Sequence, residues 1–424
     1  MGKPDQPWVE WAKNILIVLL TLSAVFLLSM TPLVQDSGLL DIFRPRSSGG
    51  GPAAGTAQTG TVLPVRLAVY RGEERYGVQY DDARMAELFA ALNPLLGDAL
   101  ASAGPSWMLT EREWQRYLQR ESMYFDFSGD VPLTVLSRWL GGEEGAAPEG
   151  SARRLALTAG GDDQVVLCWQ DTGDRTFYAC NTTLSRTLHL EPAVDGVTAG
   201  SAYFAFEDPS RPAQLEPYTL IAEGGTEGTR YTAANPLSAA AGIQAVLDAL
   251  SFNSQNHAPG SSGEVYLDGG DRLVVGDSGT VTYRAAQEGD KYPVGPGAAG
   301  AADGARSLAE QVMGILCGDA RLVPLSVQPW QEDGWRVRFG YCLNGASVYL
   351  YDEGWAAEFL VQGGYITGFT LHLRNYTAGE ADVLLPPADR AAVMLPDVTD
   401  EMRELVIRYR DWGGTSVSPG WVGV

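Results

Sequence analysis

An uncharged apolar stretch near the start of the chain constrains its architecture more than any other feature. Residues 14–34 read NILIVLLTLSAVFLLSMTPLV and contain no charged side chain. About 20 such residues are the length that crosses a bilayer as a helix. A cleaved signal peptide has a shorter apolar core and a small-x-small exit, whereas this stretch ends in Met-Thr-Pro-Leu-Val. The stretch therefore predicts an uncleaved transmembrane helix that anchors the protein by a single pass.

The orientation of this anchor follows less directly from the flanking charges. Two basic residues precede the stretch and two follow it, so the positive-inside count is balanced. Lys13 lies nearest the membrane, and the large remainder of the chain has to lie on one side of it. We expect residues 1–13 to be cytoplasmic and the C-terminal domains to be extracytoplasmic.

The charge balance of the chain excludes one class of partner. There are 52 acidic and 30 basic residues, a net charge of −22. Residues 1–60 sum to zero, so the whole excess lies in residues 61–424. Nucleic-acid binding needs a basic surface that displaces counterions, so no nucleic acid is expected as a partner. An acidic surface of this kind favours solubility.

Composition and hydrophobic periodicity divide the rest of the chain into segments. Residues 35–60 are rich in Gly, Ser, Ala and Thr, which is typical of a flexible linker. Runs of adjacent strands separated by helices then predict an α+β, multi-domain fold with mainly antiparallel sheets and packed helices. The predicted segments are an N-terminal extracytoplasmic α+β domain at 61–232, a helix plus β-hairpin unit at 233–285, a Gly/Ala-rich linker at 286–304 and a C-terminal α+β unit at 305–424.

Two helices carry clear local signals, and a third is predicted near the end of the printed sequence. Apolar residues recur at helical spacing in the first, which covers 81–100, at Met85, Leu88, Phe89 and Leu92. Thr110 and Glu113 form a capping-box pattern at the start of a second helix, Thr110–Arg120. The segment DEMRELVIRYRDW, residues 400–412, is interpreted as a last helix.

The chain has four cysteines, Cys168, Cys180, Cys317 and Cys342. None forms a C-x-x-C pair, so no zinc site is expected. Outside the membrane two disulfides are the simplest pairing, Cys168–Cys180 within one hairpin and Cys317–Cys342. Buried free thiols are the alternative, and the sequence does not choose between the two.

The segment RLVVGDSGTVTYRA contains Gly-Asp-Ser-Gly, which surrounds the nucleophile of chymotrypsin-like proteases. Turn chemistry instead predicts a hairpin. Two-residue turns would align Val265, Val274 and Val281 in one row, and Leu267, Arg272 and Tyr283 in another. A three-residue turn with Gly279 left-handed would shift these rows by one residue.

A catalytic role for Ser278 finds little support in the sequence. Thr280 and Val281 replace the Gly-Pro that follows this motif in the proteases. No histidine has the surroundings of a catalytic base: His189 and His372 are expected on strands, and His257 in a polar loop. No nucleophile elbow, Walker loop or dinucleotide fingerprint occurs. We therefore expect no enzyme activity, catalytic residue, metal site or cofactor.

The order of segments resembles the YycH and YycI regulatory proteins of Gram-positive bacteria. The resemblance rests on the anchor, SMYFDFSGDVPLTVLSRWLG, GEVYLDGGDRLVVGDSGTVTYRA, VRFGYCLNGASVYL, LVQGGYITGFTLHLRNY and the terminal SPGWVGV. Length and layout are closer to YycH, whose last part is similar to YycI. The resemblance implies a non-catalytic protein in the cell membrane that modulates a sensor histidine kinase of a two-component system, which governs cell-wall metabolism. It also implies contact with a related regulatory protein.

The predicted anchor has residues suited to such a contact. Helices in lipid associate through small and polar side chains, and the candidates for a partner-binding face are Thr21, Ser23, Ala24 and Leu28. The alternative is that Ser and Thr bond only to their own helix backbone. Two other functions stay open: an anchored surface module that binds cell-wall polymer or protein through its aromatic residues, and an anchored serine hydrolase with Ser278 as nucleophile.

Overall fold

A computed structural model describes residues 62–142, 147–198, 200–222, 226–286, 290–351, 353–394 and 402–424. The predicted anchor at 14–34 and the segments on either side of it lie outside these ranges. Within the described part of the chain, no helix is both long and apolar enough to cross a bilayer.

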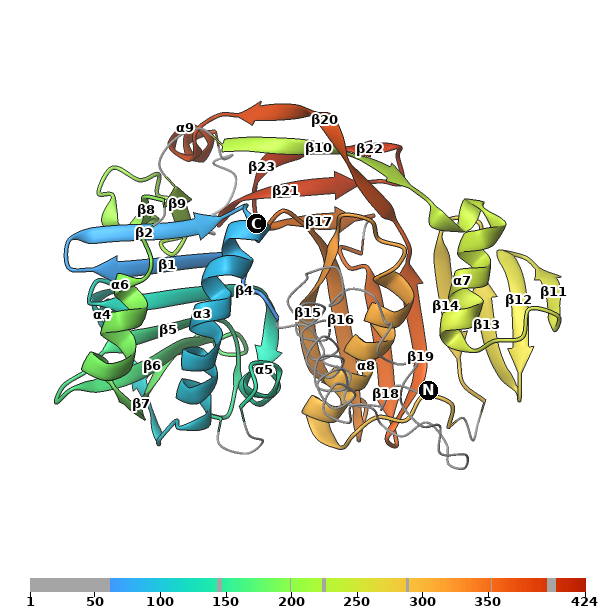
Figure 1. The fold of residues 1–424 in the computed structure, drawn as a ribbon, viewed down its shortest axis with the longest axis horizontal. Coiled ribbons are helices and arrows are strands. Elements are labelled where there is room, and N and C mark those ends of the chain that lie inside the picture. The colour runs from blue at the N-terminus through green and yellow to red at the C-terminus, as the bar shows by residue number, and fades with distance from the viewer. Residues whose placement is uncertain are drawn as a thin grey trace, which may run out of the picture. The chain divides into compact units, whose positions relative to one another are not determined.

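The N-terminal part of the described chain forms an antiparallel sheet (Figure 1). In spatial order its strands are β2 (Glu74–Gln79), β1 (Arg66–Arg71), β4 (Ser122–Pro132), β5 (Ser151–Ala159), β6 (Gln164–Asp171), β7 (Phe177–Ser185) and β3 (Ser106–Leu109). Strand alternation gives the sheet two faces. On β4, Met123 and Phe125 belong to one hydrophobic cluster, whereas Tyr124 between them belongs to another.

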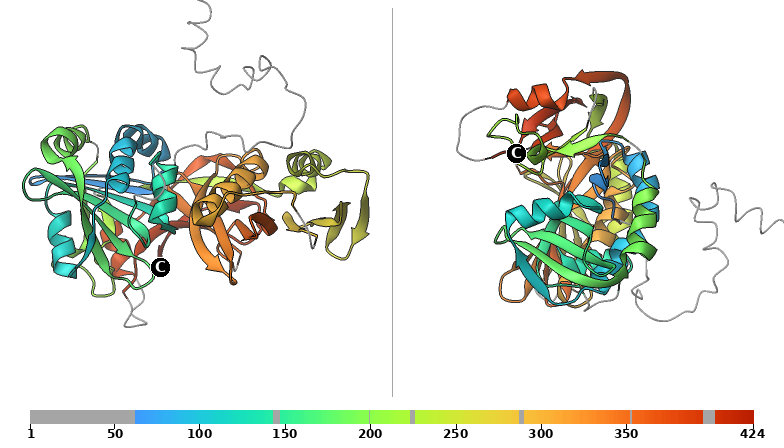
Figure 2. Two further views of the ribbon diagram at one scale, coloured as in Figure 1. Left: turned by 90° about the horizontal axis from the view of Figure 1, so that it is seen from below. Right: turned by 90° about the vertical axis from the view of Figure 1, so that its left-hand side faces the viewer.

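Helices cover both faces of this sheet. The face of Phe125 packs against α3 (Asp82–Ala101), α5 (Leu133–Trp139), the π-helical turn η2 (Arg186–Leu190) and α6 (Glu191–Asp195). The ring of Phe89 on α3 lies 5.9 Å from that of Phe125. The opposite face packs against α4 (Glu111–Leu118) through Trp114 and Leu118. Figure 2 shows α4 and the pair α3 and α6 on opposite sides of the strands.

The local signals for α3 and α4 are confirmed. The side chain of Asp81 caps α3 by accepting a 2.9 Å hydrogen bond from the backbone N–H of Arg84. At the start of α4, both bonds of the capping box between Thr110 and Glu113 are present. The apolar positions predicted for the first helix are buried: Met85, Leu88, Phe89 and Leu92.

A second set of strands contains most of the remaining chain. Its spatial order is β11 (His257–Gly260), β12 (Gly263–Asp268), β13 (Asp271–Val275), β14 (Thr280–Arg284), β19 (Tyr365–His372), β18 (Ala357–Gln362) and β16 (Gly334–Leu343). Strand β16 also pairs with β15 (Arg321–Trp330) and β17 (Ala346–Leu350). Beyond β17 follow β21 (Leu405–Asp411) in parallel and β23 (Pro419–Gly423). A parallel contact between Ser326 and Asp130 joins β15 to β4.

The remaining elements of the described residues are helices, short helical turns and two further groups of strands. They are α7 (Ala240–Leu250), α8 (Gly297–Met313), α9 (Ala388–Val393), the 3₁₀ turns η3 (Ala205–Glu207) and η4 (Pro236–Ser238), the strand pair β8 (Ala202–Phe204) and β9 (Leu220–Ala222), and the sheet of β20 (Asn375–Leu385), β10 (Thr226–Ala234) and β22 (Ser416–Val417). Strand β10 spans the predicted domain boundary at 232 and pairs with β20. The predicted N-terminal and C-terminal units therefore share a sheet.

The predicted linker at 286–304 is wrong in its second half, because α8 begins at Gly297. Ala301, Ala302 and Ala305 are fully buried in that helix. Small side chains let the helix approach its neighbours closely: a Cβ on Gly300 would lie 2.1 Å from the carbonyl carbon of Gly295. A Gly/Ala-rich composition here indicates tight packing rather than flexibility.

The predicted last helix is also wrong, since residues 405–411 form strand β21. The side chains of Leu405, Val406 and Ile407 are all buried. Strands on both sides, β17 and β23, supply the hydrogen bonds. The sequence of a strand enclosed in this way contains consecutive apolar residues. Periodicity alone does not distinguish such a run from a buried helix. At the level of fold class, the structure is α+β with a large, mainly antiparallel sheet, as predicted.

Candidate functional site

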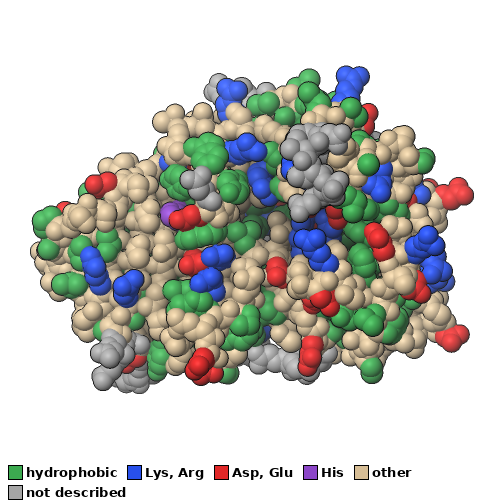
Figure 3. Space-filling model, turned by 180° about the vertical axis from the view of Figure 1, so that it is seen from behind, with side chains coloured by type: hydrophobic (Ala, Val, Ile, Leu, Met, Phe, Trp, Pro, Cys, Tyr) green, Lys and Arg blue, Asp and Glu red, His purple; other side chains and the backbone are tan. Residues whose placement is uncertain are grey.

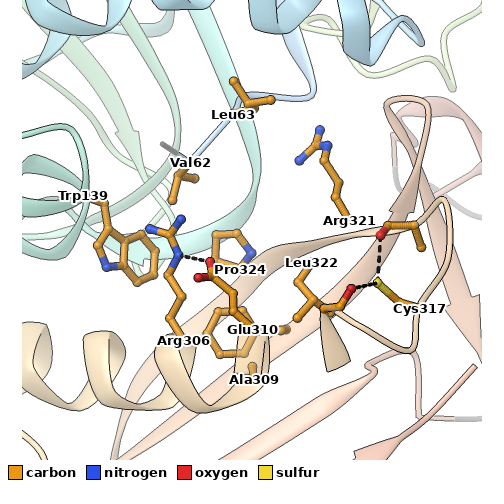
Figure 4. A pocket seen from close by; sticks show the side chains of 13 residues that line it. Val62, Leu63, Trp139, Arg306, Ala309, Glu310, Cys317, Arg321, Leu322 and Pro324 are labelled. Atoms are coloured by element: carbon orange, nitrogen blue, oxygen red, sulfur yellow. Dashed lines mark hydrogen bonds and ion pairs between the residues drawn. The ribbon is translucent and has the colours of Figure 1, made fainter. Parts of the chain in front are cut away.

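A cavity of about 270 Å³ opens beside the first described residues, Val62 and Leu63 (Figure 4). Its walls come from α5, α8, β15 and β16, and most of the lining is apolar. Besides Val62 and Leu63, the lining residues are Trp139, Arg306, Ala309, Glu310, Gly314, Cys317, Ala320, Arg321, Leu322, Pro324 and Phe339. An occupant of the cavity would contact Val62 and Leu63 as well as the walls.

The charged groups of this cavity are paired with one another or with neighbouring helices. Arg306 donates to Glu310 over 2.9 Å, and its guanidinium lies 5.3 Å from the ring centroid of Trp139. Arg321 binds Asp82 of α3 at 2.9 Å. Pairing of this kind holds α3, α5, α8 and β15 around the cavity. An apolar cavity with paired charges on its rim is suited to binding, and it brings no nucleophile together with a base.

Cys317 is the one thiol of this lining. Its Sγ donates to the backbone oxygen of Ala320 over 3.0 Å. Burial raises the pKa of the Cys317 thiol. A thiol held in the neutral form is a poor nucleophile and a poor metal ligand. The described residues contain no group of three or more His, Cys, Asp or Glu side chains placed to hold a metal ion.

A buried charge cluster links the N-terminal sheet to the C-terminal end of the chain. Six residues form it and are called the charge cluster below: Arg66, Asp126, Arg153, Arg154, Glu216 and Glu404. Asp126 on β4 accepts two bonds from Arg153, at 2.8 and 2.7 Å, and one from Arg66 at 2.6 Å. Glu404, just before β21, contacts Arg153 at 2.7 Å and Arg154 at 3.2 Å, and also contacts Arg66.

The arginines keep both central carboxyl groups ionised. Burial alone would raise the pKa of Asp126 and of Glu404, but the surrounding guanidinium groups, led by Arg153, outweigh it. They hold the pKa of Asp126 far below its usual value and lower that of Glu404 to about 2. Asp126 is fully buried and Glu404 is 5% exposed. The charge cluster therefore fixes strands together rather than exchanging protons at neutral pH.

Sequence analysis missed the charge cluster, although a signal for part of it exists. Asp126 interrupts the aromatic strand SMYFDF, and Arg66 interrupts PVRLAVY. A charged residue inside a strand that is otherwise buried requires a buried partner of opposite sign. The identity of that partner, Glu404, is not readable from the sequence because 338 positions separate it from Arg66.

The Gly-Asp-Ser-Gly segment is a turn between β13 and β14. Val265 faces Val274 and Leu267 faces Arg272, as two-residue spacing at Gly269-Gly270 predicted. At the second turn, Val274 faces Thr282 and Val275 faces Val281, so the two-residue alignment is wrong there. Gly279 has φ +91°, and the alternative three-residue turn with this glycine left-handed is confirmed.

Ser278 does not reach a histidine directly. Its Oγ lies 3.2 Å from Oγ1 of Thr280, which in turn lies 3.4 Å from Nδ1 of His372. Nε2 of His372 lies 2.8 Å from a carboxylate oxygen of Glu353. Thr280 therefore occupies the position that a base would need beside Ser278. This arrangement gives the hydrolase alternative no nucleophile–base pair at Ser278.

The histidines lie partly where they were expected. His372 is on strand β19 as predicted, where its ring packs 4.9 Å from that of Trp355. His189 is not on a strand but in the exposed turn η2, because residues 186–190 wind into a helical turn that leads into α6. His257 lies on the short exposed strand β11 rather than in a loop.

All four cysteines are free, buried thiols, so neither suggested disulfide is present. Cys168 faces Ala179 and Cys180 faces Leu167 across β6 and β7. Neighbouring positions on paired strands project to opposite faces of the sheet, and the two cysteines belong to different hydrophobic clusters. This register prevents the first pairing. Burial raises the pKa of Cys180 to about 12 and that of Cys342 to about 11.

Two other sequence expectations concern the surface and the anchor. The largest fully buried side chains are aromatic and include Trp114, Trp169 and Tyr341, so these rings lie in the core and are not available to a sugar-binding surface. On the face in Figure 3, acidic and basic side chains are both scattered among neutral and hydrophobic ones. The candidate partner-binding face, Thr21, Ser23, Ala24 and Leu28, lies outside the described residues.

Comparison with known proteins identifies a likeness of fold. The sequence matches no protein-family model and no curated protein. The crystal structure of YycH from Bacillus subtilis is similar with a TM-score of 0.54 and 9% sequence identity, over 86% of this chain and 93% of that one. An uncharacterized protein from Eubacterium rectale is similar with a TM-score of 0.30 and 12% identity, over 47% of this chain and 76% of the other. The chain thus has a YycH-like fold.

Proposed function

We propose that this protein is a membrane-anchored, extracytoplasmic regulator that modulates a sensor histidine kinase by contact, without catalysis. The observation that carries the proposal is the YycH-like fold, which extends over 86% of the chain. The order of segments in the sequence resembles the same regulatory proteins. At the level of residues, the charge cluster holds β1, β4 and β5 to the start of β21, which supports a structural rather than a catalytic use of its carboxylates.

The proposed mechanism uses two contacts with the kinase system. The helix at 14–34 would pack against a transmembrane helix of the kinase through its small and polar face, Thr21, Ser23 and Ala24 with Leu28. The folded domains would contact the kinase, or a related regulatory protein, outside the membrane. No substrate or cofactor takes part.

The test replaces residues 14–34 with an unrelated apolar helix of equal length. We expect loss of regulation, measured as the phosphorylation level of the response regulator in cells, because the new helix lacks the small and polar face. The matched control is the same replacement with Thr21, Ser23, Ala24 and Leu28 restored, which should recover regulation. Unchanged kinase output in the first variant would contradict the transmembrane mechanism. Retention on purified peptidoglycan would instead favour a cell-wall binding module.

A further inference from the structure

Strand β3 (Ser106–Leu109) is an open edge of the N-terminal sheet. It pairs with β7 along one side, and no strand among the described residues pairs with its other side. An open edge presents a row of backbone donors and acceptors to any extended chain. Proteins usually block such an edge with proline or charge, as Pro259 does on β11. The residues of β3, Ser-Trp-Met-Leu, include neither.

Large apolar side chains are exposed along this edge. Trp107 is 37% exposed and Met108 is 72% exposed. Together with Leu109 and Tyr117 they line a groove of about 180 Å³ between β3 and α4. When a peptide adds a strand to a sheet edge, backbone bonds supply affinity and neighbouring grooves receive alternate side chains. The groove beside β3 has the position that such recognition requires.

Two arginines give the groove a positive charge. Arg116 and Arg120 contribute to its lining together with Glu113. The Arg116 side chain is 67% exposed, and its ion pair with Glu113 is long, at 3.8 Å. The Arg120 guanidinium lies 4.9 Å from the ring centroid of Tyr117. In a chain with a net charge of −22, these arginines beside an open edge select a negatively charged partner.

We propose that β3 is a docking site for an extended, acidic segment of a partner protein, which adds a strand to the N-terminal sheet. Carboxylates of that segment pair with Arg116 and Arg120, and an apolar side chain packs on Trp107. This surface is separate from the predicted anchor and holds whether or not residues 14–34 act on a kinase.

The experiment measures binding of a fluorescent peptide of alternating Glu and Val, about eight residues long to match a strand, to the full chain by polarisation. We expect saturable binding that weakens with added salt. Arg116→Glu should weaken it at least about tenfold through like-charge repulsion, and Trp107→Ala should also weaken it. The matched control is Arg112→Glu, an exposed arginine of the same helix that does not line the groove, and it should bind like the unchanged chain.

Several outcomes would overturn the proposal. They are the absence of saturable binding up to about 1 mM peptide, equal binding of a Lys-Val peptide, or equal losses in the Arg112 and Arg116 variants. Self-association of the chain that Arg116→Glu abolishes, without peptide binding, would assign the edge to a second copy instead. Thermal unfolding of each variant verifies that it is folded. The assay contains no kinase, so its failure and failure of the proposed function are distinguishable.

Discussion

Glu404 contacts all three arginines of the charge cluster, Arg66, Arg153 and Arg154, and it ties them to the C-terminal part of the chain. Glu404→Gln removes one of the carboxylates that neutralise these buried guanidinium groups. We expect this substitution to lower the free energy of unfolding by about 3 kcal/mol at neutral pH. Urea unfolding followed by tryptophan fluorescence measures the change.

The same substitution has a defined pH dependence. The pKa of Glu404 is lowered from 4.5 to about 2 in the folded protein, so its contribution to stability is complete above pH 4.5 and is lost as pH falls toward 2. The difference between the two chains should therefore shrink through this window. The control is Glu87→Gln, which breaks an exposed pair with Arg84 and should cost less than about 1 kcal/mol. Equal losses in both variants would refute the role of Glu404.

The four buried thiols lead to a prediction about redox behaviour. Because no disulfide is present, a reductant should leave the melting temperature unchanged. Thiol reagents should label all four cysteines only after unfolding, since the folded protein buries each thiol and raises its pKa. Mass spectrometry of the unreduced protein is the check, and a mass lower by two hydrogens would indicate a disulfide.

At the scale of elements, substitutions in the turn between β13 and β14 distinguish a structural from a catalytic role of Gly-Asp-Ser-Gly. Gly279 has a positive φ, and a Cβ there would lie 2.8 Å from the carbonyl oxygen of Leu373. We expect Gly279→Ala to destabilise the protein by about 1 to 3 kcal/mol, and Ser278→Ala to change stability by less than about 0.5 kcal/mol.

A neighbouring turn supplies the control for this pair. Gly269 also has a positive φ, but a Cβ there meets nothing within 4 Å. Gly269→Ala should therefore show backbone strain alone, about 1 kcal/mol, and less loss than Gly279→Ala. Thermal unfolding compares all three. A larger loss in Ser278→Ala than in Gly279→Ala would contradict the turn interpretation.

Elements with a strong local signal were predictable from the sequence, and elements set by tertiary surroundings were not. Helix α3 has apolar residues at helical spacing and a capping residue at its start, so the local sequence alone identifies it as a helix. Strand β21 is a strand because β17 and β23 enclose it. Helix α8 begins with Gly and Ala, whose burial depends on neighbours such as Val294. Here packing overrides local composition.

At the scale of the whole molecule, the fold class was predictable, but the links between distant parts were not. Alternating runs of strands and helices suffice for an α+β assignment. The pairing of β10 with β20, and of Arg66 with Glu404, joins residues that no local pattern relates. The open edge at β3 likewise becomes visible only when the order of strands in the sheet is known.

The placement of β21 has a consequence for biosynthesis. Buried charges fix both of its ends: Glu404 precedes it, and Asp411 at its end binds Arg374 at 2.8 Å. Ribosomes make proteins from the N-terminus, so Arg66, Arg153 and Arg154 exist long before Glu404 does. A chain truncated ahead of residue 404 would keep these arginines without the carboxylate that they share. Because those guanidinium groups would then be buried with fewer counter-charges, such a product should hold its N-terminal sheet less stably than the full chain does.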